Sequence, residues 1–266
     1  MLPRNTILAF AAITCMSRSC LAAEPYTGIF ERLNRIAALP QLSSEVKTRI
    51  IASLPKQGEI QGLSAKQRRK LDSLAPVLRA HDREYLVKVF ESRQARIAIH
   101  ARFVVLITDT ALQILNPAGL QAIVAHEIGH EYVWEEYEDA RKRNDWTRQR
   151  ELELFCDGMS MLTLARIGAA PTTLIDALHI MYASNSRNGI MTDPLRDSHP
   201  SLSERGRFAK AMMKWLADKS TLTDPPAKAR DSPRQLCCAH RFEQFVYIIA
   251  AGQAAVRPRS TVWILP

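Results

Sequence analysis

The chain has 266 residues, of which 47% are hydrophobic, and its 36 lysines and arginines exceed its 27 acidic residues to give a formal net charge of +9. This apolar content suits one globular domain with appended helices. The basic residues are scattered and no nucleic-acid motif accompanies them, so we expect no nucleic-acid partner and at most a weak contact with an anionic membrane surface.

The first 23 residues have the pattern of an export signal peptide. Arg4 precedes a short apolar stretch at residues 6–16, and small residues at Ala22 and Ala23 offer a cleavage site before Glu24. The apolar stretch is shorter than the roughly 20 residues that a membrane span requires. We therefore expect a cleaved leader and an exported chain, periplasmic or secreted, with an uncleaved anchor as the alternative.

The next part of the chain predicts helices followed by a small sheet. Apolar spacing favours three helices and two strands, at residues 29–39, 44–54, 64–79, 84–91 and 103–108. With the helices further along, this predicts a mostly helical α+β fold. His100 alternates with apolar neighbours and has no second metal donor at helical or hairpin spacing, so we interpret it as a strand residue and not as a ligand.

A long helix is predicted in the middle of the chain. Asn116 and Pro117 have the residue types of an N-cap and a first helical position, and a buried stripe follows at Leu120, Ile123 and Val124. We expect this helix to run from residue 117 to beyond residue 132. The charged residues at 135–143 are interpreted as its solvated continuation.

This helix carries the residue pattern of a hydrolytic zinc centre. His126 and His130 are four residues apart, so they lie one turn from each other on the same face, where both imidazoles can hold one ion. Glu127 lies beside that face and can act on metal-bound water as a general base without being a ligand. The segment therefore predicts metal-dependent hydrolysis.

A catalytic zinc ion takes three protein ligands and one water, so the histidine pair needs a third donor. We expect this donor to be Glu153, in a helical run that ends near Ile167 with Gly168 as its cap. Glu153 and Asp157 share an apolar face of that helix, where acids need a cation or hydrogen-bond donors. Asp157 can orient a ligand histidine through its free N–H, and Glu151 is the solvent-facing alternative to Glu153.

Cleavage of the leader leaves Cys156, Cys237 and Cys238, an odd number that argues against a disulfide framework. Cys156 is interpreted as a small buried apolar residue. Two alternatives stay open: Cys156 as a thiolate ligand, or as the partner of Cys237 or Cys238 in a disulfide.

Four blocks of residues occur in the order found in one peptidase family. The segments at 126–130, 153–157, 168–171 and 198–200, the last followed by Arg205, resemble metallopeptidase family 48, the HtpX-like and CAAX prenyl protease group of zinc gluzincins. The glycine-rich approach to an edge strand that is usual in that family is absent from residues 96–108. This departure concerns substrate recognition and not metal binding.

The resemblance implies a zincin-like metallopeptidase domain, placed at residues 24–222, and a role for each matching residue. It implies a zinc ion held by His126, His130 and Glu153. It further implies that Glu127 is the general base and that Asp157 supports a ligand. In the same way, it implies that His199 acts as a switch or transition-state donor and that Arg205 supports the cleft. The alternative for His199 is a loop histidine ahead of a helix that Ser201 and Glu204 cap.

The C-terminal part of the chain is predicted to be helical on both sides of a linker. Helices are expected at residues 174–182 and 202–217, a proline-rich linker at 223–235, and a last helix and tail at 236–266. We expect the last helix to dock on the core, with a partner-binding or membrane-surface helix as the alternative.

Two functions follow from these residues. The first is an exported zinc endopeptidase that acts on polypeptides, for which the resemblance implies a role in envelope protein quality control. The second is a zinc-containing binding or chaperone-like module that His199 closes as a fourth ligand. The intact Glu127 favours the first, because a purely structural site needs no base.

Overall fold

The computed structural model describes residues 25–55, 57–190 and 198–223. Within these ranges the chain is mostly helical with one small mixed sheet, which confirms the predicted α+β class. The elements are α1 (Thr27–Leu33), α2 (Ser44–Ser53), α3 (Ala65–Asp72), α4 (Ala75–Ala80), β1 (Leu86–Phe90), β2 (Ile97–His100), β3 (Val104–Thr108), α5 (Asp109–Ile114), α6 (Pro117–Gly129), the 3-10 helix η1 (His130–Tyr132), α7 (Trp134–Lys142), α8 (Trp146–Arg166), α9 (Thr173–Arg187) and α10 (Leu202–Thr223). The linker was predicted from residue 223, but Thr223 is the last residue of α10. The predicted leader, the rest of the linker, the last helix, and Cys237 and Cys238 lie outside the described residues. Among the helices of the described ranges, none has the length and apolar character to cross a membrane.

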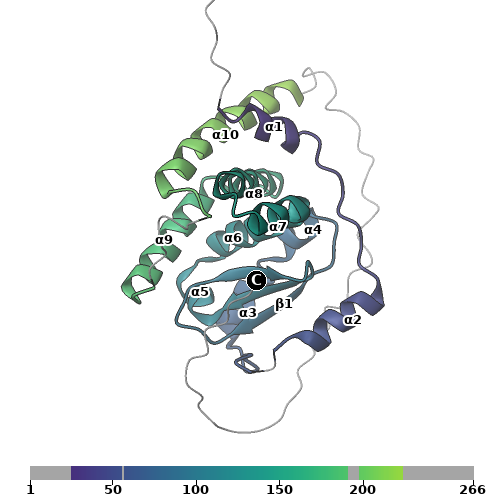
Figure 1. The fold of residues 1–266 in the computed structure, drawn as a ribbon. Helices are drawn as coiled ribbons and strands as arrows, with labels where there is room; N and C mark the ends of the chain where they lie inside the picture. Colours follow the sequence, from purple (N-terminus) through teal and green to yellow (C-terminus); the bar gives the residue numbers. More distant parts are fainter. Residues whose placement is uncertain (1–24, 56, 191–197, 224–266) are drawn as a thin grey trace, which may run out of the picture.

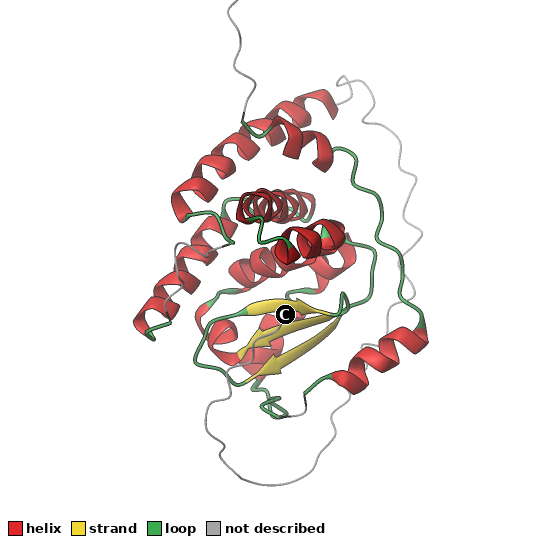
Figure 2. Ribbon diagram, viewed as in Figure 1, coloured by secondary structure: helices red, strands yellow, loops and turns green. Residues whose placement is uncertain are grey.

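The helices are stacked over the sheet. Figure 1 shows α6 next to the sheet and α8 on the other side of α6, with α1 and α10 beyond α8. α7 also packs against α8, and α9 packs against α6. Figure 2 shows the three strands at one end of this stack of helices. The arrangement leaves α6 enclosed between the sheet and α8.

The sheet has the strand order β1-β3-β2, with β1 parallel and β2 antiparallel to β3. β1 and β3 confirm the two predicted strands, and His100 is the last residue of β2, as its interpretation as a strand residue requires. β2 itself is not predicted as a separate strand. Its turn to β3 holds Ala101 and Arg102 at φ 48° and 62°, where asparagine and glycine are the usual residues. The turn residues of this hairpin therefore give no sequence motif from which it could be predicted.

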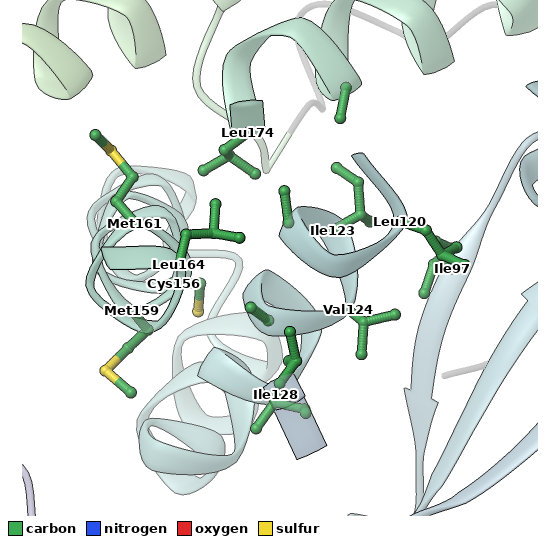
Figure 3. Close-up of a cluster of buried hydrophobic side chains, with 14 of the residues drawn as sticks. Ile97, Leu120, Ile123, Val124, Ile128, Cys156, Met159, Met161, Leu164 and Leu174 are labelled. Atoms are coloured by element: carbon green, nitrogen blue, oxygen red, sulfur yellow. The ribbon is translucent and has the colours of Figure 1, made fainter. Parts of the chain in front are cut away.

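The core lies between α6, α8 and α9. Figure 3 shows Leu164 of α8 pointing toward α6, Val124 of α6 pointing toward the side of the strand that carries Ile97, and Leu174 of α9 above the two helices. At Gly129 the two central helices are so close that a Cβ would lie 2.9 Å from the Cα of Cys156. Only glycine allows this approach without movement of a backbone.

Helix α8 ends where the sequence predicts. Gly168 has a φ of 75°, a conformation that glycine adopts at low cost. The N–H of Gly168 donates to the carbonyl of Ala165 and the N–H of Ala169 donates to that of Leu164, at 3.2 and 2.9 Å. This pair of bonds terminates the helix.

Two of the predicted N-terminal helices are wrong in extent. The helix predicted at 64–79 is two helices, α3 and α4. Pro76 is the cause, because in one continuous helix its ring would clash with the carbonyl of Asp72, whereas in α4 it occupies the first turn, where no N–H is needed. The helix predicted at 29–39 ends at Leu33.

The prediction of a single helix from 117 to beyond 132 is also wrong. α6 ends at Gly129, η1 follows, and α7 is a separate helix and not a solvated continuation. At the bend Glu131 is buried, where it accepts hydrogen bonds from Arg83 Nη1 and Arg102 Nε, both at 2.9 Å. Val133 is buried in the core beside it. Gly129 precedes this bend, but its φ of −53° is helical, so it is not the left-handed glycine that commonly ends a helix.

Candidate metal centre

The two histidines lie at the C-terminal end of α6. The helix starts as predicted, with the Asn116 side chain accepting a hydrogen bond from the N–H of Gly119 at 2.7 Å. His126 is buried in the last turn, and His130 is the first residue of η1. Their ring centroids are 5.2 Å apart with the rings nearly perpendicular. The 3-10 turn therefore preserves the predicted one-turn relation of the two imidazoles.

Glu153 of α8 joins this pair. Its side chain is 0% exposed, with Oε2 at 3.3 Å from His126 Nε2 and Oε1 at 3.6 Å from His130 Nε2. One ligand atom from each of the three residues lies within 4.8 Å of the others, an arrangement that could hold a metal ion. Ligand atoms about 2.0–2.2 Å from a tetrahedral zinc ion are separated by about 3.4 Å. The two separations between Glu153 and the imidazoles, 3.3 and 3.6 Å, are close to this value.

Asp157 and Arg205 surround the buried side of the cluster. Asp157 Oδ1 lies 2.9 Å from His126 Nδ1, a close contact in which the N–H is not aligned for a strict hydrogen bond. Arg205 donates to Asp157 Oδ1 at 2.6 Å and to Glu153 Oε2 at 3.0 Å. Arg205 thus joins α10 to both acids of α8. At 3% exposed, it lies behind the cluster.

Burial and neighbouring charges shift the ionisation of the cluster. Burial raises the pKa of the Glu127 carboxyl to about 7, although the nearby His126 opposes the shift. Burial alone would lower the pKa of His126, but contacts with Asp157 and Glu153 raise it to about 10. For Glu153, burial is outweighed by His199 and His130, and the pKa of its carboxyl lies well below the usual range.

The charges of the cluster favour a cation. With neutral imidazoles, the carboxylates of Glu153 and Asp157 outnumber Arg205 by one charge, and the ionised form of Glu127 adds a second. Asp157 Oδ2 is buried without a hydrogen-bond partner in the described part of the chain. A buried excess of negative charge is costly unless a cation compensates it, so the residues present fit a divalent ion.

His199 lies at the open side of the site. Its side chain is 55% exposed, and its Nε2 lies 3.6 Å from Glu153 Oε1. It is not among the three residues whose ligand atoms gather within 4.8 Å. The helix after it begins as predicted, with the N–H of Glu204 donating to Ser201 Oγ at 3.2 Å. The structure therefore brings His199 near the cluster but outside the group of three.

Tyr137 of α7 is a residue of the site that the sequence analysis misses. Its hydroxyl donates to Glu153 Oε1 at 3.0 Å, and its ring meets the His130 ring edge to face, with centroids 4.9 Å apart. On a continuous helix, its spacing of seven residues from His130 would indicate the same face. The charged residues around it concealed this relation.

Two alternative ligands are placed elsewhere. Glu151 is exposed and accepts a hydrogen bond from Arg148 at 2.8 Å. Cys156 is fully buried beside Gly129 in the apolar core, where Figure 3 labels it, and its sulfur is not part of the group of three. Burial also raises the pKa of its thiol well above the usual range, which disfavours a thiolate.

Comparison with known proteins adds no family to this picture. No family model matches the chain, and no curated protein matches it. The geometry of the cluster and the residue pattern are therefore the observations on which a function has to rest, and the resemblance to metallopeptidase family 48 stays a hypothesis.

Proposed function

We propose that this protein is an exported zinc endopeptidase of zincin-like fold, which hydrolyses peptide bonds with water as the nucleophile. The observation that carries the proposal is the convergence of His126, His130 and Glu153 from two helices, with Glu127 beside them. Two nitrogen donors and one carboxylate suit zinc, whereas calcium and magnesium prefer ligand sets made of oxygen. Three protein ligands leave a fourth position for water.

The role of each side chain follows from its position. A bound zinc ion lowers the pKa of water toward about 7 and polarises a carbonyl group. Glu127 takes the proton from the water and passes it to the leaving amine, a task suited to a carboxyl with a pKa of about 7. Asp157 holds the His126 ring so that Nε2 faces Glu153.

Arg205 and His199 have different roles. Both terminal nitrogens of Arg205 are bound to the acids of α8, so we assign it to positioning and charge compensation and not to the oxyanion of the substrate. His199 is half-exposed beside the cluster, which suits a donor to that oxyanion. The export leader predicted at residues 1–23 supports polypeptides of the cell envelope as the substrate class.

The substitution Glu127→Gln tests this proposal. The variant keeps the size of the side chain but cannot take the proton, so we expect cleavage of unfolded casein to fall at least about 100-fold while zinc content stays at one ion per chain. Glu151→Gln is the matched control, because it makes the same change on the exposed side of α8. We expect it to cleave like the unaltered protein. Metal analysis and casein cleavage are measured on the same three preparations.

The outcomes separate the endopeptidase from the alternative function. An active Glu127→Gln enzyme would show that Glu127 is not the base. Zinc in all three proteins without cleavage by any of them would favour the binding or chaperone-like module, for which the 3.6 Å between His199 Nε2 and Glu153 Oε1 is the supporting observation. Absence of zinc from the unaltered protein would exclude both functions.

A further inference from the structure

Tyr137 connects two of the three proposed ligands. Its hydroxyl donates to the carboxylate oxygen of Glu153 that lies nearer to His130, and its ring packs edge to face against the His130 imidazole. The residue comes from α7, a helix that otherwise carries mainly charged side chains. A single side chain of α7 thus contacts both η1 and α8 at the cluster.

The other oxygen of Glu153 is held from the opposite side. Arg205 donates to Oε2 at 3.0 Å, while Tyr137 donates to Oε1 at 3.0 Å. With a donor on each oxygen, the carboxylate cannot rotate about its last bond without the loss of a hydrogen bond in a buried site.

We propose that Tyr137 is a positioning residue of the metal centre, which fixes the Glu153 carboxylate and the His130 ring in the orientation that binds the ion. This inference rests on the proposed function, because it assigns a role toward the zinc ion. Residues that hydrogen-bond to metal ligands typically contribute about 10–100-fold to metal affinity. α7 is then part of the metal centre and not merely a charged surface helix.

The substitution Tyr137→Phe tests the inference, because it removes only the hydroxyl. Tyr132→Phe is the matched control: it deletes the same group five residues away, where the hydroxyl contacts His81 Nδ1 at 3.0 Å and no proposed ligand. Zinc affinity is measured by competition with a coloured chelator, and the visible spectrum of the cobalt(II)-loaded proteins reports ligand geometry. We expect a loss of at least about 10-fold in zinc affinity and a changed cobalt spectrum for Tyr137→Phe alone.

Each result decides the inference. Unaltered zinc affinity in Tyr137→Phe, or an equal loss in Tyr132→Phe, overturns it, while zinc binding and cleavage by the unaltered protein leave the proposed function standing. If the unaltered protein binds no zinc, the inference and the proposed function both fall. If Tyr137→Phe is unfolded without metal, its refolding is followed while zinc is titrated. Refolding that needs a zinc concentration at least about 10-fold above the one that saturates the unaltered protein supports the inference. Failure to refold overturns it.

Discussion

Glu153 shows how one residue depends on its surroundings in this protein. An ionised carboxylate at 0% exposure is unfavourable by itself, and Arg205 compensates its charge from behind. The spacing of Glu153 and Asp157 on one helix can be seen in the sequence. The contact of both with an arginine some 50 positions later depends on how α10 packs on α8.

His81 leads to a prediction about pH. It is buried between the Tyr132 hydroxyl and the Thr163 hydroxyl, and burial, aided by the charge of Arg166, lowers its pKa from 6.5 to about 4. Because the folded-state pKa is lower than the unfolded-state pKa, the neutral ring stabilises the fold above pH 6.5. This stabilisation is lost as pH falls from 6.5 toward 4.

We expect the contribution of His81 to the free energy of unfolding to fall by about 2–3 kcal/mol between pH 7 and pH 4.5. Urea denaturation at both pH values measures it, and His81→Gln serves as the reference because glutamine does not titrate. The pH-dependent loss should be smaller in His81→Gln by that amount. An identical loss of unfolding free energy in the two proteins would contradict the lowered pKa of His81.

At the scale of elements, the close approach of α6 and α8 sets the geometry of the proposed metal centre. The histidines belong to the end of α6 and to η1, whereas Glu153 belongs to α8, so the distance between the two helices determines whether the three ligands meet. Gly129 sits directly between the two histidine-bearing turns and Cys156 of α8. Any side chain there pushes the helices apart.

Gly129→Ala tests this dependence. The new Cβ would lie 2.9 Å from the Cα of Cys156, so we expect destabilisation of about 1–3 kcal/mol and a fall in zinc affinity of at least about 10-fold. Gly206→Ala, in α10, is the matched control because nothing lies within 4 Å of its Cβ, and there alanine should stabilise the helix slightly. Urea denaturation and chelator competition on both variants measure the effects. Equal zinc affinity in Gly129→Ala and the unaltered protein would show that the close approach of α6 and α8 at Gly129 does not determine zinc binding.

At the scale of the whole molecule, a metal ion would link helices that are distant in sequence. The proposed ligands come from α6, η1 and α8, and α10 reaches the same acids through Arg205. These groups meet only in the folded chain. An ion bound there therefore stabilises the whole fold and not one helix.

Removal of the metal should lower the melting temperature. At free zinc 100-fold above the dissociation constant, binding contributes about 2.7 kcal/mol, which corresponds to about 5–10 °C for a chain of this size. Differential scanning fluorimetry before and after chelation, and after zinc is restored, measures the shift. Glu127→Gln should keep the shift and His130→Gln should lose it. If the melting temperature of the unaltered protein does not change when zinc is removed, metal binding does not stabilise the fold and the prediction is wrong.

Residues close together in the sequence carried most of what could be predicted. The cap at Asn116, the glycine at 168 and the four-residue spacing of His126 and His130 act within a few residues, and the structure contains each of these features. Pro76 acts as locally, because it separates α3 from α4 within the single helix predicted at residues 64–79. Helix caps and helix-face spacings can be predicted from sequence because one turn of helix involves only neighbouring residues.

Tertiary structure alone decided the remaining features. The bend after Gly129 and the burial of Glu131 against Arg83 have no sequence signature, and the contact of Tyr137 with Glu153 joins residues of two different helices. The sequence by itself determined that two histidines share a helix face and that acids follow on a second helix. The apolar neighbours of Glu153 also favoured it over Glu151. The side chains that hold Glu153 in place, Tyr137 and Arg205, were decided by the packing of buried surfaces, because such contacts join residues whose separation along the chain follows no fixed period.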